Sequence, residues 1–236
     1  PMPVRPTVHY CMGGIPVNTD GRVRSSGENL TEGFFAAGEC SCVSVHGANR
    51  LGSNSLLECV VYGRRTGRAI ANYLSQRKFP EFDASFYLEK AQSKITSLLA
   101  QKGTLRVAQL RQQFQDSMTE HCGVFRTEAT MRAGLEQLQQ LKQQYSQIYL
   151  DDQDRNWNTE LIEALELESI MIVGEIILTS ALHRQESRGA HSREDYPNRD
   201  DVHFLSHTLA YYSASGIDIN YMPVVINMFE PKERKY

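Results

Sequence analysis

One run of the sequence combines residue types that bind small anions. Residues 46–57 read HGANRLGSNSLL, so His46 and Arg50 come just before a turn rich in Gly and Ser and an apolar stretch. An Arg guanidinium matches a carboxylate in bidentate fashion, and a helix N-terminus presents unpaired N–H groups with a partial positive charge. His9, in a segment that ends at two glycines, can donate one further hydrogen bond. His9 and Arg50 together predict a clamp for a dicarboxylate.

The same residues also have simpler structural explanations. An Arg before a helix is more often part of a surface ion pair. A single His on a strand is more often a hydrogen-bonded structural residue. The residue types alone therefore permit a binding site at His9 and Arg50 and leave both interpretations open.

The elements that must position this clamp begin with strands and one helix. Residues 7–45 carry β signals, with short strand-like runs at 7–10, 15–17, 22–24 and 33–38 separated by Gly-rich and Asn-Thr-Asp-Gly turns. Apolar residues then recur at helical spacing over 55–74, after Ser53, Asn54 and Ser55, which are good capping residues. We expect residues 1–78 to form one unit.

Residues 79–186 predict a helical bundle. Helical patterns cover 86–101, a short piece around 107–118, then 127–149 and 158–183. The third carries an apolar stripe at steps of three or four, made of Met131, Leu135, Leu138, Leu141, Tyr145 and Ile148. A coiled coil is the alternative, but the heptad pattern is short and Lys142 interrupts it. Helix 158–183 is apolar on several sides, which predicts a place at the centre of the bundle.

Residues 187–236 predict a polar loop followed by a hairpin. The stretch 186–201 holds four acidic residues after Glu186 and three Arg, and is either a solvated loop or a segment pinned to another surface. Residues 204–212 and 219–229 read as two strands around a Ser-Ala-Ser-Gly turn. The predicted fold class is therefore α+β, with strands and one helix, then a helical bundle, then a terminal β-hairpin.

Composition excludes several classes of function. A net charge of -3 provides no basic field, so nucleic acid is not an expected partner. The longest apolar stretch, 170–182, contains Glu175 and follows four other Glu, which favours a buried helix over a membrane span. Five Cys without a CxxC pair and without a signal peptide favour free thiols in a reducing compartment. Cys40-Ser41-Cys42 as a metal or redox pair is disfavoured because such sites use other spacings and more ligands.

Four segments of the chain carry distinctive motifs, in the order VRPTVHYCMGG (4–14), GFFAAGEC (33–40), HGANRLGSNSLL (46–57) and SRGAH with REDYP (187–197). In order and spacing they resemble the flavoprotein subunit of succinate dehydrogenase and fumarate reductase. The resemblance covers essentially the whole chain and corresponds to the C-terminal part of that subunit. The chain begins with Pro1 and enters a strand-like run without an initiator Met, so we expect it to be a fragment of a larger protein.

The resemblance implies specific roles for five residues. His9 and Arg50 correspond to the residues that hold the carboxylates of succinate or fumarate. Glu39 corresponds to a residue that binds the FAD ribose or its surroundings, and Ser55 and Leu56 to residues that contact the flavin ring. The dipole of the helix that begins there would stabilise negative charge on the reduced flavin.

The resemblance also implies an activity and partners. The reaction is hydride transfer between a substrate carbon and FAD, and the acid-base Arg of the family lies in the portion that this chain lacks, so no catalytic residue and no metal ligand is expected here. No G-x-G-x-x-G follows a strand, so the chain alone should bind FAD poorly and turn over nothing. Expected partners are an iron-sulfur subunit, membrane anchor subunits and the missing N-terminal half, with a peripheral location on the cytoplasmic side of a membrane.

Two alternatives stay open at this point. L-aspartate oxidase shares an HGANR and SNSLLE-like run, and the Leu-Leu-Glu-Cys stretch ending at Cys59 leans toward it. The 193–201 stretch and the terminal hairpin fit the dehydrogenase and reductase pattern better. A non-catalytic interaction module built from the helices between residues 86 and 183 is the second alternative.

Overall fold

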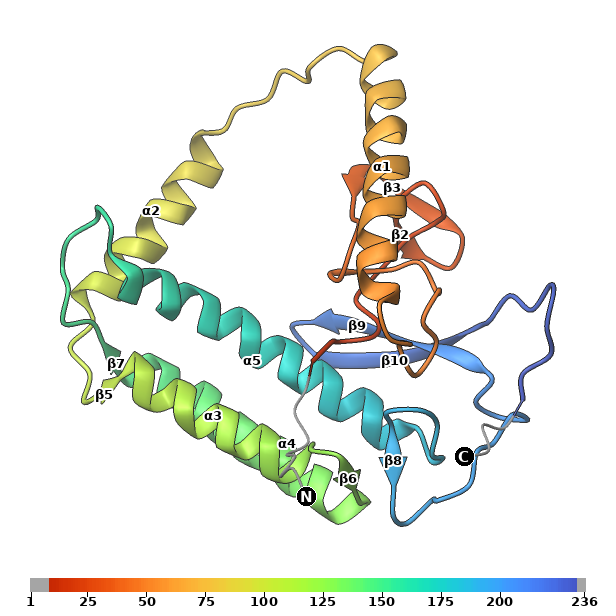
Figure 1. The fold of residues 1–236 in the computed structure, drawn as a ribbon. Coiled ribbons are helices and arrows are strands. Elements are labelled where there is room, and N and C mark those ends of the chain that lie inside the picture. The colour runs from red at the N-terminus through yellow and green to blue at the C-terminus, as the bar shows by residue number, and fades with distance from the viewer. Residues whose placement is uncertain (1–8, 233–236) are drawn as a thin grey trace.

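The computed structural model describes residues 9–232 (Figure 1). The side chains of these residues form two separate hydrophobic cores. The smaller core consists of Val17, Val23 and Ala36. It lies among the elements β1 (Ile15–Pro16), β2 (Arg22–Ser26), β3 (Asn29–Phe35), β4 (Ser41–Cys42) and α1 (Asn54–Ser75). β1 pairs with β4 in parallel and β2 with β3 in antiparallel fashion. Of the predicted strand at 7–10, residues 7 and 8 lie outside the described residues, and 9 and 10 are not in a strand.

Helix α1 covers almost the predicted residues, but its N-terminus is not capped as predicted. Its N-cap residue, Ser53, has a left-handed backbone with φ of 66°, and its side chain makes no capping hydrogen bond. Capping by a Ser oxygen normally uses an extended N-cap backbone, so the prediction of side-chain capping is wrong here. Most apolar side chains of α1 are exposed, with Leu56 at 72% and Val60 at 69%, while Glu58 and Thr66 are buried.

The larger core belongs to a helical bundle. It is built by α2 (Ser85–Ala100), α3 (Val107–His121), α4 (Glu128–Gln144) and α5 (Thr159–His183). Helix α5 packs against α2, α3 and α4, and also against the last two strands, which confirms its predicted central place. In Figure 1 it runs diagonally through the middle of the fold. Buried side chains on these helices include Leu110, Met131, Leu138, Leu167 and Leu178.

The predicted helix over 127–149 is too long. Helix α4 ends at Gln144, a 3-10 turn η1 (Tyr145–Gln147) follows, and β7 (Ile148–Tyr149) then pairs in parallel with β5 (Leu105–Arg106). Tertiary pairing overrides helical propensity at this end. Ile148 is nevertheless completely buried, so the apolar stripe correctly predicted a buried side chain in a differently folded segment.

The C-terminal hairpin consists of β9 (Ser206–Ser213) and β10 (Gly216–Pro223), which pair in antiparallel register. Both strands contact α5. The second strand begins and ends earlier than the predicted 219–229. Pro223 is its last residue, because a Pro has no N–H to continue the ladder.

The segment between α5 and β9 is a pinned loop with a buried ionic cluster, not a solvated one. Glu186 has no exposed surface and Arg193 is 1% exposed. β8 (Ser192–Arg193) pairs in parallel with β6 (Phe125–Arg126) at the end of the bundle. The alternative in which this stretch is pinned to another surface is therefore confirmed.

Glu186 is the centre of the ionic cluster. Its carboxylate lies 2.8 Å from Arg184 Nη2 and 2.9 Å from Arg188 Nε, and it accepts a 2.8 Å hydrogen bond from the Asp200 N–H. Burial alone would raise the pKa of Glu186, but the hydrogen bonds from Arg188, Arg184 and the Asp200 N–H lower it below its usual 4.5. The ionised Glu186 carboxylate therefore stabilises the folded state above pH 4.5. This contribution is lost as the pH falls through the lower pKa that Glu186 has in the folded protein.

Glu186→Gln is expected to reduce the free energy of unfolding by about 3–5 kcal/mol, because two guanidiniums lose their shared buried carboxylate. Denaturant unfolding followed by circular dichroism measures the loss. Glu168→Gln is the matched control, since Glu168 forms an ion pair with Lys94 in which both side chains are exposed. The control should cost less than about 1 kcal/mol. Equal small losses for the two variants would contradict this account of the cluster.

Residues 9–232 contain neither a candidate membrane span nor a candidate metal site. No helix in this range combines the length and apolar character that a membrane crossing requires. No group of three or more His, Cys, Asp or Glu side chains in this range is placed to hold a metal ion. The cysteines at 11, 40, 42, 59 and 122 are free thiols.

Candidate functional site

Three side chains from different segments meet beside the start of α1. Glu58, on the second turn of the helix, is 4% exposed. The Tyr10 hydroxyl donates a 2.6 Å hydrogen bond to Glu58 Oε2, and His46 Nε2 lies 2.6 Å from the same oxygen. The Tyr10 and His46 rings pack edge to face with their centroids 5.3 Å apart. One buried carboxylate therefore joins the N-terminal segment, the 46–50 loop and α1.

The geometry of the cluster indicates which groups donate hydrogen bonds to Glu58. Burial, with the hydrogen bond to Glu58 and its charge, raises the pKa of Tyr10 far above its usual 10. The phenol therefore stays protonated at neutral pH and donates. His46 Nε2 lies against the same carboxylate oxygen, and a proton on this nitrogen makes it a second donor to Glu58.

Arg50 is held next to this cluster by an aromatic face. Its guanidinium carbon lies 5.2 Å from the centroid of the Tyr10 ring, and Nη1 donates a 3.2 Å hydrogen bond to the Leu51 carbonyl. Arg50 Nε is buried without an acceptor, and no carboxylate among residues 9–232 lies within ion-pair distance of this guanidinium. Within the part of the chain that the structure describes, Arg50 therefore does not form the ion pair of the simpler interpretation, and its charge is available to an anion.

His9 is exposed and directly precedes Tyr10. Since Tyr10 packs on Arg50 and His46, the structure brings the segment that carries His9 beside the 46–50 loop. The pairing of the His9 and Arg50 side chains across one ligand remains a prediction.

The three residues predicted to hold FAD lie on the exposed side of the same region. Glu39 is exposed and accepts a 3.2 Å hydrogen bond from the Cys11 N–H. Ser55 is half-buried and Leu56 is 72% exposed, both on the first turn of α1. Within the described part of the chain, the N–H groups of Ser55 and Leu56 have no acceptor. Unpaired donors beside an exposed apolar side chain fit the polar edge and flat ring of a flavin.

The pinned loop between α5 and β9 also contacts the 46–50 loop that carries Arg50. The Ala190 N–H donates a 2.9 Å hydrogen bond to the Ala48 carbonyl. Gly189 has φ of +58°, and a Cβ added there would lie 2.3 Å from the Ala48 oxygen. Only a Gly permits this close approach.

Two residues that support the site, Glu58 and Gly189, are not among the predicted site residues. An acidic residue inside an otherwise apolar helical stretch signals a buried polar partner, and Glu58 carries that signal. The contact of Gly189 with Ala48 joins distant parts of the chain and leaves no local signal in the sequence.

If Arg50 binds a dicarboxylate in a larger subunit, as the resemblance implies, Gly189→Ala is expected to shift the Ala48 backbone and raise the KM for that dicarboxylate about tenfold, since small misplacements of binding groups are costly. Gly216→Ala is the matched control, because Gly216 also has a positive φ but its added Cβ meets nothing within 4 Å. Steady-state kinetics on both variants measure the effect. An equal rise in KM for the control would show that backbone strain, not contact with the Arg50 loop, is responsible.

Comparison with known families settles the class of protein. A family model described as fumarate reductase flavoprotein C-term matches residues 111–236, more than half of the chain. The chain belongs to the succinate dehydrogenase and fumarate reductase flavoprotein family. A second model, FAD binding domain, matches residues 1–56, and together with the flavoprotein relatives it indicates FAD as the cofactor.

Individual members of the family are similar over the whole chain. The fumarate reductase flavoprotein subunit of Mycobacterium tuberculosis is 40% identical over 100% of this chain and 40% of its own length. The succinate dehydrogenase flavoprotein subunit of Coxiella burnetii is 42% identical over 99% and 41%, respectively. The solved E. coli quinol fumarate reductase FrdA superposes with a TM-score of 0.88 at 37% identity, covering 99% of this chain and 40% of FrdA. The chain thus spans about 40% of the length of these relatives.

These similarities confirm the resemblance inferred from the four sequence segments and the mixed helix and strand fold. They also do not favour L-aspartate oxidase or a helical interaction module, because the relatives carry dehydrogenase and reductase names.

Proposed function

We propose that this chain is the C-terminal part of an FAD-dependent subunit that interconverts succinate and fumarate. The observation that carries the proposal is the state of Arg50. Its guanidinium is fixed on the Tyr10 ring, lacks a carboxylate partner among the described residues, and lies just before the unpaired N–H groups of α1. An Arg in this condition is prepared to bind a carboxylate of the substrate.

Each residue of the candidate site has a separate task in this proposal. Arg50 binds and polarises one carboxylate of the diacid, and His9 donates a hydrogen bond to the other. The carboxylate of Glu58 fixes Tyr10, whose ring in turn fixes Arg50, so the Arg50 side of the clamp is held in place before substrate arrives.

The second task is to hold the cofactor. FAD, when bound, supplies the acceptor or donor of the hydride. Glu39 would hold the region of its ribose, and Ser55 and Leu56 on the first turn of α1 would contact its ring. The positive end of the α1 dipole favours the negative charge of the reduced state.

The rest of the subunit completes the enzyme. The exposed apolar side chains of α1, Leu56, Leu57, Val60 and Val61, form the surface on which we place the remainder of the FAD-binding domain. Residues 1–78 then belong to that domain, 79–186 form the bundle and 187–236 the pinned loop and hairpin. No acid-base residue is assigned to this chain, so it is expected to be inactive alone.

The proposed partners follow from the family. One solved relative is titled quinol-fumarate reductase with menaquinol molecules. We place an iron-sulfur subunit against this flavoprotein subunit and separate anchor subunits in the membrane, with the chain peripheral on the cytoplasmic side.

Turnover by the complete subunit, expressed with the residues that precede Pro1 in the full protein, tests the proposal. Succinate should reduce an artificial electron acceptor, and fumarate should oxidise a reduced viologen dye. L-aspartate should give no turnover. Comparable turnover of L-aspartate would assign the chain to an oxidase, and an FAD-loaded subunit without turnover of any diacid would favour the interaction module.

A further inference from the structure

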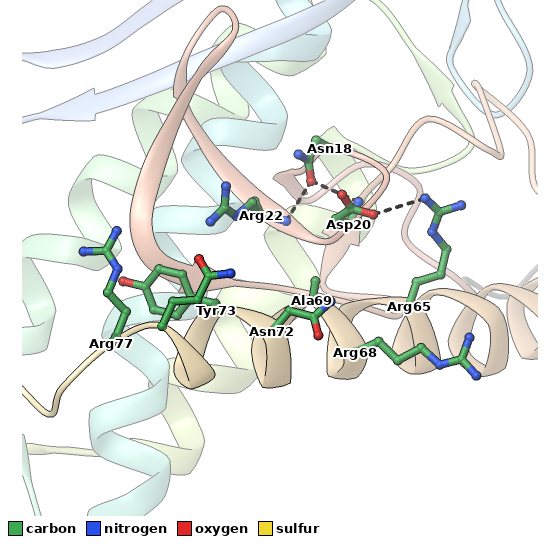
Figure 2. A pocket seen from close by; sticks show the side chains of 10 residues that line it. Asn18, Asp20, Arg22, Arg65, Arg68, Ala69, Asn72, Tyr73 and Arg77 are labelled. Carbon is green, nitrogen blue, oxygen red and sulfur yellow. Dashed lines mark hydrogen bonds and ion pairs between the residues drawn. The ribbon is translucent and has the colours of Figure 1, made fainter.

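A groove rich in arginine lies between the C-terminal half of α1 and the turn that leads into β2, with a volume of about 610 Å³ (Figure 2). Four arginines and a single acidic residue line it, namely Arg22, Arg65, Arg68, Arg77 and Asp20. The side-chain amides of Asn18, Asn72 and Gln76 also face it. The groove is therefore positively charged, although the whole chain has a net charge of -3.

Two of the guanidiniums share one aromatic ring. The Tyr73 ring has the guanidinium carbon of Arg22 at 5.8 Å and that of Arg77 at 5.1 Å from its centroid. Arg22 also lies 5.9 Å from the Phe35 ring. Cation-π contacts fix the position of a guanidinium without neutralising it. Two positive groups are therefore held around the same ring.

The four arginines of the groove have fewer acidic partners than positive charges. Arg77 forms an ion pair with Glu32, which also accepts a hydrogen bond from the Tyr73 hydroxyl. Arg65 lies 3.1 Å from Asp20, as the dashed line in Figure 2 shows. Among residues 9–232, neither Arg22 nor Arg68 has an ion-pair partner.

The walls of the groove are fixed before any ligand binds. Asn18 Oδ1 accepts 3.0 Å hydrogen bonds from both the Asp20 and the Arg22 N–H groups, which shapes the turn. A Cβ added at Gly21 would lie 2.0 Å from Thr66 Oγ1, so the turn rests directly on α1. A preformed site loses little entropy when it binds a ligand.

Further polar side chains extend the groove along α1 from the two guanidiniums at Tyr73. Arg65, Arg68, Asn72 and Gln76 follow one another along a single side of α1 at steps of three and four. At a rise of about 1.5 Å per residue, this row extends over roughly 16 Å. Positive and amide side chains therefore continue along the groove beyond the two guanidiniums at the Tyr73 ring.

We propose that this groove binds a small multivalent oxyanion, a molecule with two or more phosphate or carboxylate groups. Arg22 and Arg77, which both contact the Tyr73 ring, bind the anionic groups together with the Asn72 amide, and Arg65 and Arg68 add positive charge farther along the groove. Phosphate and carboxylate share the chemistry that an Arg fork recognises. Neither Arg50 nor His9 lines this groove, so the proposal does not depend on succinate or fumarate chemistry.

Isothermal titration of the complete subunit with pyrophosphate, citrate and orthophosphate, at constant ionic strength, tests the proposal. Pyrophosphate or citrate should bind saturably at one site, at least about tenfold more tightly than orthophosphate. The tighter of the two distinguishes a phosphate ligand from a carboxylate ligand. An Arg50→Ala background removes binding of citrate at the clamp and should leave groove binding unchanged.

Variants locate the binding in the groove. Arg22→Ala and, separately, Arg77→Ala should each weaken it by about tenfold or more, and Arg22→Lys should weaken it also, because the planar fork is lost. Arg132→Ala is the control with the same change in charge, since Arg132 pairs with Glu128 on the surface of α4, and it should change the affinity less than about twofold. Circular dichroism confirms that each variant is folded. Absence of saturable binding, or equal weakening by Arg132→Ala, would overturn the proposal.

Discussion

Arg50→Lys in the complete subunit is expected to lower kcat/KM for succinate and for fumarate by about a hundredfold to a thousandfold. A Lys keeps the charge but loses the planar fork that binds a carboxylate through two parallel hydrogen bonds. It also loses the flat contact with the Tyr10 ring that fixes the group in place. Steady-state assays in both directions measure the change.

Arg132→Lys makes the same exchange at a surface ion pair and should leave kcat/KM within about twofold. The FAD content of both variants, measured by absorbance, should equal that of the unmodified subunit, because Arg50 is proposed to bind substrate and not cofactor. Full activity of Arg50→Lys would remove Arg50 from the clamp.

Glu58→Ala is expected to reduce the free energy of unfolding by about 1–3 kcal/mol, because it leaves the Tyr10 hydroxyl and His46 Nε2 without their common acceptor. The same change should raise the KM for a dicarboxylate about tenfold or more, since Tyr10 no longer holds Arg50 in place. Denaturant unfolding and steady-state kinetics on the complete subunit measure the two effects separately.

The variant Glu58→Gln distinguishes a role of Glu58 in positioning Arg50 from a role in the stability of the fold alone. The amide retains one acceptor oxygen, so it should restore much of the affinity for substrate that Glu58→Ala loses. A KM that stays at the unmodified value in a destabilised Glu58→Ala variant would show that Glu58 supports the fold alone and does not position Arg50.

Much of the bundle could be predicted from the sequence because its signals are local. The period of the apolar residues identified the helices now seen as α2 to α5, and the stripe that includes Met131 and Leu138 is buried as expected. The prediction extended helix α4 too far because the pairing of Ile148 with Leu105 involves residues distant in the sequence.

The residue types of the candidate site could be predicted from the sequence, but the contacts that hold these residues in place could not. A Gly and Ser-rich turn before a helix, with Arg50 in front, indicates anion binding from local sequence alone. The carboxylate that holds this turn is Glu58, and its partner Tyr10 lies 48 positions earlier in the chain. The left-handed backbone of Ser53 and the approach of Gly189 to Ala48 likewise depend on contacts that no local pattern encodes.

A structure of the complete subunit with FAD and fumarate tests the central claim most directly. The account predicts that both terminal nitrogens of Arg50 lie about 2.7–2.9 Å from one carboxylate of fumarate. It predicts His9 within hydrogen-bond distance of the other carboxylate, with the Tyr10 ring still beneath the guanidinium. An Arg50 side chain paired with a carboxylate of the protein, or a fumarate bound away from both residues, would contradict it.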